Sequence, residues 1–554
     1  MDPRHLAAAI TDGPTGARRR AWIAAVAFPE RVLGRSHEEE YAASLHKTAL
    51  LLSFFAQHDI KNVDDQEAIS EALGAVLPLD MHRKMYVPAL RISMSPDQWA
   101  RWSASPHRFI GAYAQTELGA SPSSHLREPR RVGHGSNVRA IETTATYDAD
   151  RGDFDLHSPT LTSRKWWPGG LGKTATFAVV YARLLHAGTD YGVHAFHVQL
   201  RHEMTHKSLE GVTLGDIGAK VGFNGVDNGF CAFDHVRVPK DGLLLGAARV
   251  AWSATGELQP APASAPAQWG YFTMVKTRVF LVGKAARFLA RALAITLPEV
   301  AGRPAVARML YPSVGLALAA AFAGQALHQL YQRVLLARDV PELRRLHALS
   351  SGLKALVTTR AVDGIDACVR AGGYDLRLGH AVPYLRAEIV GSVTYEGTFD
   401  VLVLQHGAAL RKSPPLSVTR RTWRLDEPDD VVALFERRVQ NLRDARGKSA
   451  FWTTKLSVAA SELQLLLALR DAAVAQADAP TCRVLWKLWQ LLAFQWMVES
   501  LHEFRAEGML SSAQGDALVP TIEAAAQDLD DNILNVVAAW GFTEKEKRLL
   551  HAKL

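Results

Sequence analysis

A block of short β-rich runs, enclosed on both sides by long helical stretches, constrains the fold of this chain more than any other feature. The runs are separated by Gly, Asp and Asn residues that are typical of turns. They comprise Ile141–Tyr147, Phe154–Ser158, Ala175–Leu184, Ala195–Leu200 and Phe230–Val238. This pattern predicts a central antiparallel β barrel or sandwich.

Apolar residues with helical spacing precede and follow this block. A Pro-containing segment, residues 255–268, is predicted to be a linker. The helices expected after it are Val275–Leu297, Leu316–Ala337, Pro341–Val357, Thr358–Gly372, Pro428–Arg446, Leu456–Ala477, Arg483–Ala506 and Pro520–Ala539. We therefore predict an α+β multidomain fold. Its parts are an N-terminal α-helical domain (1–108), a central β domain (109–250), an α-helical bundle (251–411) and a C-terminal α-helical domain (412–554).

Composition describes a globular chain and argues against several classes of function. A chain of 554 residues is too long for one core, and 48% of its residues are hydrophobic. The net charge of +7 is not concentrated in a basic block, so we expect no nucleic-acid partner. The apolar runs Val314–Ala323 and Val484–Val498 are too short or too interrupted to span a membrane and are predicted to be buried helices. Three distant cysteines, without disulfide or metal spacing, indicate a reducing compartment.

Three short segments carry residues suited to binding and catalysis. Thr116 offers a hydroxyl in a Gly-flanked turn, and Trp166-Trp167-Pro168-Gly169-Gly170 combines indole rings with glycines that let backbone approach a flat ligand. Glu396 is a carboxylate in a loop before an apolar run. Taken singly, each has an ordinary structural explanation: a turn hydroxyl, core tryptophans and a solvated acid.

In combination, these segments resemble the acyl-CoA oxidase family within the acyl-CoA dehydrogenase superfamily. The resemblance covers residues 18–412 and extends more weakly to the C-terminus. The matching segments are Tyr113–Gly119, His134–Arg139, Glu142–Asp148, Lys165–Lys173, Gly215–Gly218, Asp227–Gly229, Leu346–Leu349 and Tyr395–Gly397. The order of helical, β and helical parts is similar to that family as well.

The resemblance implies an FAD-dependent oxidase that desaturates acyl-CoA to trans-2-enoyl-CoA and reduces O2 to H2O2, the first step of peroxisomal fatty acid β-oxidation. Glu396 aligns with the base that removes the α proton of the thioester. The positions implied in FAD binding are Thr116, Trp166, Trp167, Gly169, Gly170, Gly372 and Gly373. The family resemblance also implies a homodimer, and no residue is predicted to bind a metal.

The last three residues, Ala552-Lys553-Leu554, are a variant of the Ser-Lys-Leu peroxisomal signal. They predict a peroxisomal location and binding to the peroxisomal import receptor. A His-Glu-x-x-His pattern, His202–His206, follows a β run rather than lying on a helix, which argues against zinc.

Three departures from the family pattern leave an alternative open. In one, Ala371–Tyr374 lacks the family's further small residues, and Thr398-Phe399-Asp400 replaces the acidic-Asn pattern after Gly397. Residues Ala120–Gly133 interrupt the motif after Gly119, and the family's Arg-Arg-Gln segment, which contacts the FAD pyrophosphate, is missing. Arg303 or Arg308 would have to replace it, although Pro298 and Pro304 are expected to break the helix there. The alternative is a non-catalytic family member that binds CoA thioesters and holds FAD weakly. A third hypothesis, an acyl-CoA dehydrogenase that passes electrons to a flavoprotein, is disfavoured by the C-terminal helices and the Ala-Lys-Leu tail.

Overall fold

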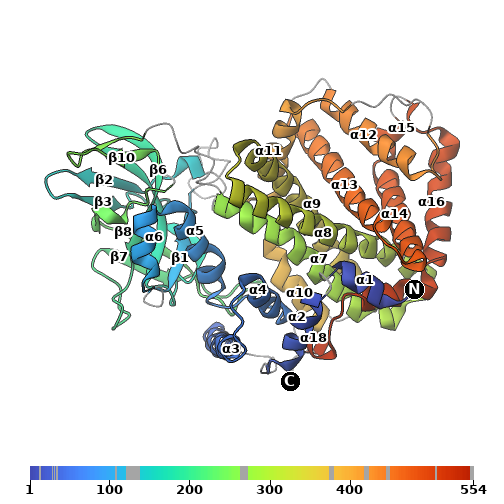
Figure 1. Ribbon diagram of the computed structural model, residues 1–554, viewed down its shortest axis with the longest axis horizontal. Helices are drawn as coiled ribbons and strands as arrows, with labels where there is room; N and C mark the ends of the chain where they lie inside the picture. The colour runs from blue at the N-terminus through green and yellow to red at the C-terminus, as the bar shows by residue number, and fades with distance from the viewer. Residues whose placement is uncertain are drawn as a thin grey trace.

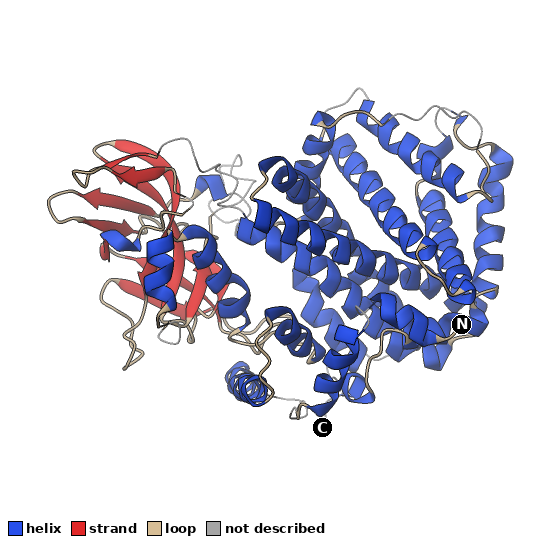
Figure 2. Cartoon of the chain, viewed as in Figure 1, coloured by secondary structure: helices blue, strands red, loops and turns tan. Residues whose placement is uncertain are grey.

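A computed structural model describes residues 1–548, apart from 11–13, 28, 30–31, 33–34, 106–108, 120–137, 247, 262–271, 374–379, 417–422, 445–448 and 506–507. A β-rich part stands beside a much larger helical body (Figures 1 and 2). This confirms the predicted order of helical, β and helical parts. The insert at 120–133, His134 of the family motif and the Ala552–Leu554 tail lie outside the described residues.

The β part contains two main sheets. The six-stranded sheet contains β1 (Gly111–Ala114), β5 (Phe177–His186), β2 (Thr144–Asp148), β3 (Asp153–His157) and β9 (Val236–Pro239), with β6 (Thr189–Gln199) also paired to β5. The three-stranded sheet contains β4 (Lys165–Gly169), β8 (Asn228–Phe233) and β7 (Val212–Asp216). A separate hairpin, β10 (Val250–Trp252) and β11 (Leu258–Pro260), occupies part of the predicted linker.

The prediction of a purely antiparallel β domain is wrong in one respect. Strand β5 runs parallel to both β1 and β2, with Gly111 opposite Phe177 and Thr144 opposite Arg183. Long connections, rather than hairpin turns, join β1 and β2 to β5, so the chain enters β5 in the same direction. The remaining pairs of this sheet are antiparallel.

The helical bundle consists of α7 (Phe272–Val300), α8 (Pro304–Ala337), α9 (Val340–Gly372), α10 (Ala381–Val390) and α11 (Phe399–Lys412). Helix α9 is continuous where two helices were predicted. Nothing at the expected break interrupts it, since Val357 and Thr358 are buried and the Thr358 hydroxyl donates to the Lys354 carbonyl within the same helix.

The C-terminal helices share one hydrophobic core with the bundle, which extends from Leu6 to Phe542. They are α12 (Pro428–Asp444), α13 (Ala450–Val474), α14 (Ala479–Glu499), α15 (Leu501–Arg505), α16 (Ser512–Gln527), α17 (Asp530–Ala538) and α18 (Glu544–Arg548). Of the helices in the described ranges, α8 is the one long and apolar enough to cross a membrane by length and composition, and 72% of that stretch is buried inside the protein.

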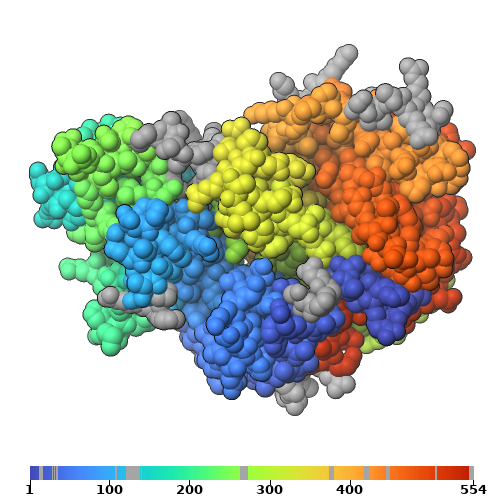
Figure 3. Space-filling model, in the orientation of Figure 1, coloured from blue at the N-terminus to red at the C-terminus, as the bar shows by residue number. Residues whose placement is uncertain are grey.

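The N-terminal helices are divided among three apolar clusters. Helix α1 (Pro3–Ile10) packs on the bundle core, whereas α2 (Pro14–Ala25), α3 (His37–Gln57) and α4 (Val63–Ala72) enclose a small cluster of their own. The π-helix η1 (His82–Tyr86), with α5 (Val87–Ser93) and α6 (Pro96–Ser103), packs on the β part. In Figure 3 the blue N-terminal helices cover the lower side of the junction between the green β part and the yellow bundle.

We expect Arg438→Met to destabilise the C-terminal helices strongly. Arg438, 1% exposed, donates to Glu462 (2.5 Å) and Glu503 (2.6 Å), and its loss leaves both carboxylates buried without this partner. The free energy of unfolding, measured with urea, should fall by about 3–5 kcal/mol. Lys487→Met removes an exposed ion pair with Asp528 and should cost at most about 1 kcal/mol. Equal losses for the two variants would mean that burial of Arg438 adds nothing to the strength of its contacts.

Candidate active site

The two β-domain segments predicted to face a cofactor lie directly against each other. The Trp166 amide donates to the Thr116 carbonyl at 3.0 Å, and the Leu118 amide donates to the Arg164 carbonyl at 2.9 Å. A bridge between Glu117 and Lys165 continues the pairing. The structure therefore places the Thr116 turn beside the Trp166–Gly170 segment.

A buried ion pair that no sequence pattern predicted fixes this arrangement. Lys165 Nζ lies 2.8 Å from Glu117 Oε1 and donates to the Tyr181 carbonyl at 2.6 Å, and both charged side chains are at most 1% exposed. Glu117 also accepts from the amides of Glu142 (2.7 Å) and Thr143 (3.0 Å). Burial lowers the pKa of Lys165, while the Glu117 carboxylate opposes that shift. The only sign of this ion pair in the sequence was a charged residue in each of two family motifs, Glu117 in one and Lys165 in the other.

The two tryptophans have different environments. Trp166 stacks on Phe230 with ring centroids 5.6 Å apart, so one of its faces already has a protein partner. Trp167 is 41% exposed and has a left-handed backbone with φ of 84°. Its carbonyl accepts from Asn228 Nδ2 at 2.8 Å, and Asn228 Oδ1 is buried without a hydrogen-bond partner. Trp167 is therefore the tryptophan of this pair with more surface available to a ligand.

The glycine segment that follows is held from beneath by a buried arginine. Gly170 has φ of +89°, a conformation that side chains rarely adopt. Arg201, 5% exposed, donates at 2.9 Å to the carbonyls of both Leu171 and Gly172. The Gly169–Gly172 backbone is thus fixed before any ligand binds.

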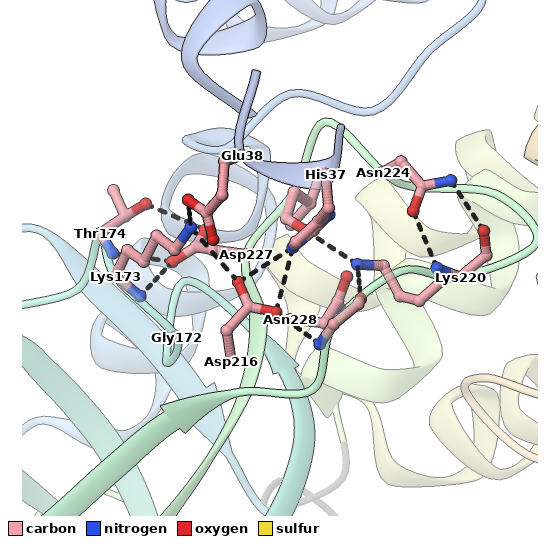
Figure 4. A network of polar contacts seen from close by, with 12 residues as sticks. His37, Glu38, Gly172, Lys173, Thr174, Asp216, Lys220, Asn224, Asp227 and Asn228 are labelled. Atoms are coloured by element: carbon pink, nitrogen blue, oxygen red, sulfur yellow. Dashed lines mark hydrogen bonds and ion pairs between the residues drawn. The ribbon is translucent and has the colours of Figure 1, made fainter. Parts of the chain in front are cut away.

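A polar network joins helix α3 to the loops around this segment (Figure 4). Fully buried Asp227 accepts from the amides of Lys173 and Thr174, each at 2.7 Å. His37, at the start of α3, lies 3.1 Å from both oxygens of Asp216. Burial raises the pKa of Asp227, and its hydrogen bonds oppose that effect. The N-terminal helices thereby help to position loops of the β domain.

Glu396 lies in a tight turn between the short helix η6 (Gly391–Val393) and α11, with φ of 59°. Two buried cations bind consecutive carbonyl groups of this turn. Arg278 Nε donates to the Glu396 carbonyl at 2.9 Å, and Lys354 Nζ donates to the Gly397 carbonyl at 2.7 Å. Arg278 also contacts His347 Nε2 and Ser351 Oγ, each at 3.2 Å. The backbone that carries Glu396 is therefore fixed from α7 and α9.

These surroundings place the carboxylate near neutrality. Burial raises the pKa of Glu396 to about 7, while Arg278 and Lys354 oppose the shift. Burial, assisted by Arg278, lowers the pKa of Lys354 to about 7. Burial likewise lowers the pKa of His347 to about 4, so His347 is neutral at pH 7. A carboxylate with such a pKa is suited to general acid–base chemistry.

The loop between β7 and β8, residues 217–227, links the Trp167 segment to the Glu396 turn. Phe223 packs against Tyr395 with ring centroids 5.6 Å apart, and its amide donates to Glu388 Oε1 at 3.1 Å. The loop then leads into Asn228, which binds the Trp167 carbonyl. Through this loop, the predicted site residues of the β domain and the turn of Glu396 are parts of one connected structure.

The predicted glycine pair at the end of α9 lies apart from the other site residues. Gly373 caps α9 with φ of 62°. It lies 19 residues beyond Lys354, which corresponds to roughly 28 Å along a helix. One chain therefore does not bring Gly372 and Gly373 to the Glu396 turn.

Neither candidate arginine for the missing Arg-Arg-Gln segment is free of contacts within the chain. Helix α7 ends two residues after Pro298, and α8 begins at Pro304, as expected for these prolines. Arg303 donates to the Glu299 carbonyl at 3.4 Å, and Arg308 donates to Gln495 of α14.

His202–His206 form a turn rather than a helix, so their imidazoles do not share a helical face. In the described ranges, His157, Asp234 and His235 bring ligand atoms within 4.8 Å of one another. The two imidazole rings, however, stack at 4.1 Å with an interplanar angle of 15°. In that geometry their in-plane lone pairs do not converge on one ion.

Comparison with known families and proteins adds independent evidence. The family described as acyl-coenzyme A oxidase N-terminal matches residues 2–109, acyl-CoA oxidase, C-alpha1 domain matches 299–411, and acyl-CoA oxidase matches 430–546. Peroxisomal acyl-coenzyme A oxidase 1 of Arabidopsis thaliana is 40% identical over 60% of this chain and 52% of its own length. The Homo sapiens protein of the same name is 34% identical over 68% of this chain and 58% of its own length. These alignments thus span little more than half of each relative.

Solved structures show the same similarity over nearly the whole chain. Arabidopsis thaliana acyl-CoA oxidase 1 superposes with a TM-score of 0.89 at 28% identity, over 100% of this chain and 92% of the other. Caenorhabditis elegans acyl-CoA oxidase-1, complexed with FAD and ATP, gives a TM-score of 0.88 at 27% identity, over 99% and 90% of the two chains.

Glu396→Gln should increase stability in a pH-dependent way. Because the Glu396 pKa rises from 4.5 to about 7 on folding, the wild-type protein loses stability as pH rises through that interval. At pH 8 the variant should have a free energy of unfolding about 1–3 kcal/mol higher, and below pH 4.5 the difference should vanish. Urea unfolding at several pH values measures this, with Glu210→Gln on an exposed turn as control. A difference independent of pH would contradict the assigned environment.

Proposed function

Because the chain belongs to the acyl-CoA oxidase family, we propose that it is an FAD-dependent oxidase of acyl-CoA thioesters. The products would be a trans-2-enoyl-CoA and H2O2. The single observation that carries this proposal is the half-enclosed Glu396 carboxylate, on a turn whose backbone carbonyls accept from Arg278 and Lys354 and which one loop connects to the exposed Trp167.

The residues near Trp167 fit a flavin. The exposed indole offers a flat apolar surface, and Gly169 and Gly170 leave backbone accessible beside it. The partnerless Asn228 Oδ1 offers a hydrogen-bond acceptor, and Thr116 lies in the adjacent turn. When bound there, FAD supplies the acceptor for the substrate hydride and the route by which electrons reach O2.

Glu396 would act as the base. The Cα–H bond breaks, the proton passes to a Glu396 carboxylate oxygen, and the electron pair remains in the thioester. Such a C–H group is weakly acidic, so the base must be poorly solvated and correctly placed. Burial satisfies the first requirement, and the fixed turn between η6 and α11 satisfies the second.

We further propose that two chains assemble, so that the Gly372–Gly373 end of α9 from one chain completes the dinucleotide site of the other. The separation between this glycine pair and the Glu396 turn supports that arrangement. We also propose that the protein is located in peroxisomes, and that the import receptor recognises Ala552-Lys553-Leu554. The peroxisomal location is supported by the relatives, several of which are named peroxisomal.

A second function remains a candidate because of a specific observation. Arg303 donates to the Glu299 carbonyl and Arg308 to Gln495, so within the described residues both arginines considered as substitutes for the missing Arg-Arg-Gln contact to FAD already have partners. An Arg–phosphate contact contributes on the order of 2–5 kcal/mol when desolvated. The alternative is a protein that binds CoA thioesters but retains FAD weakly. Purified protein that stays colourless and cannot be reconstituted with FAD would decide for this alternative.

For the oxidase, we expect Glu396→Gln to lower turnover by about 10²–10⁴-fold while FAD remains bound, because the amide cannot accept the α proton. Peroxide release with a series of straight-chain acyl-CoAs measures turnover, and flavin absorbance measures occupancy. Glu210→Gln should behave as wild type. Undiminished turnover in Glu396→Gln would remove this residue as the base.

Trp167→Ala should weaken FAD binding by about 2–15-fold, the value of one aromatic stacking contact. Quenching of flavin fluorescence on titration with apoprotein measures the dissociation constant. Trp452 of α13, 38% exposed, provides a matched surface control. If Trp167→Ala and Trp452→Ala bind FAD equally well, Trp167 does not contact the flavin.

A further inference from the structure

Lys354 donates to the Gly397 carbonyl, but the proposed reaction assigns no task to its charge. It is 0% exposed in the middle of α9, and its Nζ donates to the Gly397 carbonyl at 2.7 Å. Among the described residues, no carboxylate lies within ion-pair distance of this ammonium group. A buried cation with so few compensating contacts is costly, so its position beside the Glu396 turn requires an explanation.

The charged and titratable groups around Glu396 come from several elements. Arg278 approaches its turn from α7 and Lys354 from α9, His347 of α9 contacts Arg278, and Tyr395 precedes Glu396 in the turn. His347 is neutral at pH 7 because burial lowers its pKa, and burial raises the pKa of the Tyr395 phenol. The positive charges that act on Glu396 are therefore that of Arg278 and that of Lys354, whose ammonium form is present below its pKa of about 7.

Arg278 and Lys354 are not equivalent. Arg278 is shared among the Glu396 carbonyl, His347 and Ser351, so it also ties α7 to α9. Lys354, in contrast, donates to the Gly397 carbonyl. Glu396, with φ of 59°, has a left-handed backbone that is unfavourable for a residue with a side chain, whereas Gly397 adopts its φ of +110° readily. The hydrogen bond from Lys354 to the Gly397 carbonyl therefore supports the strained residue that precedes it.

We propose that Lys354 is a positioning residue for Glu396, which holds the Gly397 carbonyl and supplies positive charge that keeps the Glu396 carboxylate ionised before substrate binds. The inference rests on the proposed oxidase function. It adds that the pH at which the enzyme becomes active is set by the lysine on α9 together with Arg278.

Two substitutions separate the charge of Lys354 from its hydrogen bond. Lys354→Gln retains an N–H donor but removes the charge, so the acid limb of the kcat/KM profile should move upward by about one pH unit. Lys354→Met removes both, so kcat should fall further, by about 10-fold or more, with KM changed less than about twofold. Lys487→Gln, at the exposed ion pair with Asp528, should keep the wild-type profile.

The step affected can be identified directly. Anaerobic exchange of α-deuterium from an acyl-CoA into solvent reports proton removal without the reaction with O2, and it should slow in both Lys354 variants. Unchanged acid limbs and unchanged exchange in both variants would overturn the proposal.

If both Lys354 variants fail to fold, the coupling between Lys354 and Glu396 can be tested by a measurement that leaves Lys354 in place. In protein labelled with 15N-lysine, Glu396→Gln should lower the titration midpoint of Lys354 by about one pH unit, since the neighbouring negative charge is gone. No movement would overturn the proposal. Failure of the wild-type protein to release peroxide or exchange deuterium with any acyl-CoA would refute the oxidase function instead, and the lysine titration would still test the charge coupling.

Discussion

Arg278 and Lys354 each donate to a carbonyl of the turn that carries Glu396, and the geometry of the site depends on this pair of hydrogen bonds. They stabilise the left-handed backbone of Glu396, which is unfavourable for a residue with a side chain. The same cations offset the burial of the Glu396 carboxylate, and this balance places its pKa near neutrality. One pair of contacts therefore sets both the position of the base and its protonation.

The β part uses buried charge in a similar way. Lys165 and Glu117 join the Thr116 turn to the Trp166 segment, and Arg201 holds the carbonyls beside the glycines. Unpaired buried charges are unfavourable, so each of these groups strongly disfavours alternative loop conformations. The resulting surface around Trp167 is preorganised, which reduces the ordering that a bound ligand would require.

Local sequence patterns predicted most helices and the β block, and they singled out the segments that carry Thr116, Trp167 and Glu396. The patterns failed where the outcome depends on distant contacts. The parallel pairing of β5 with β1 and β2 follows from chain direction, not from strand periodicity. Arg278 and Lys354 lie on amphipathic helices among many other charged residues, and only the packing of α7 against α9 brings them to Glu396. Likewise, Gly372 lies far from the site because α9 is one continuous helix. The sequence around Val357 and Thr358, where two helices were predicted to meet, does not show whether the helix continues.

The cost of the charges around Glu396 bears on the choice between an oxidase and a binding protein. A lysine and an arginine, 0% and 3% exposed, face a carboxylate that lies partly enclosed with them. Apolar residues of similar volume in place of Arg278, Lys354 and Glu396 together would often give a fold at least as stable. A chain that only binds CoA thioesters has no use for a carboxylate poised near pH 7. The energetic cost is explained if Glu396 exchanges a proton during a reaction, which favours the oxidase even though the Arg-Arg-Gln contact is missing.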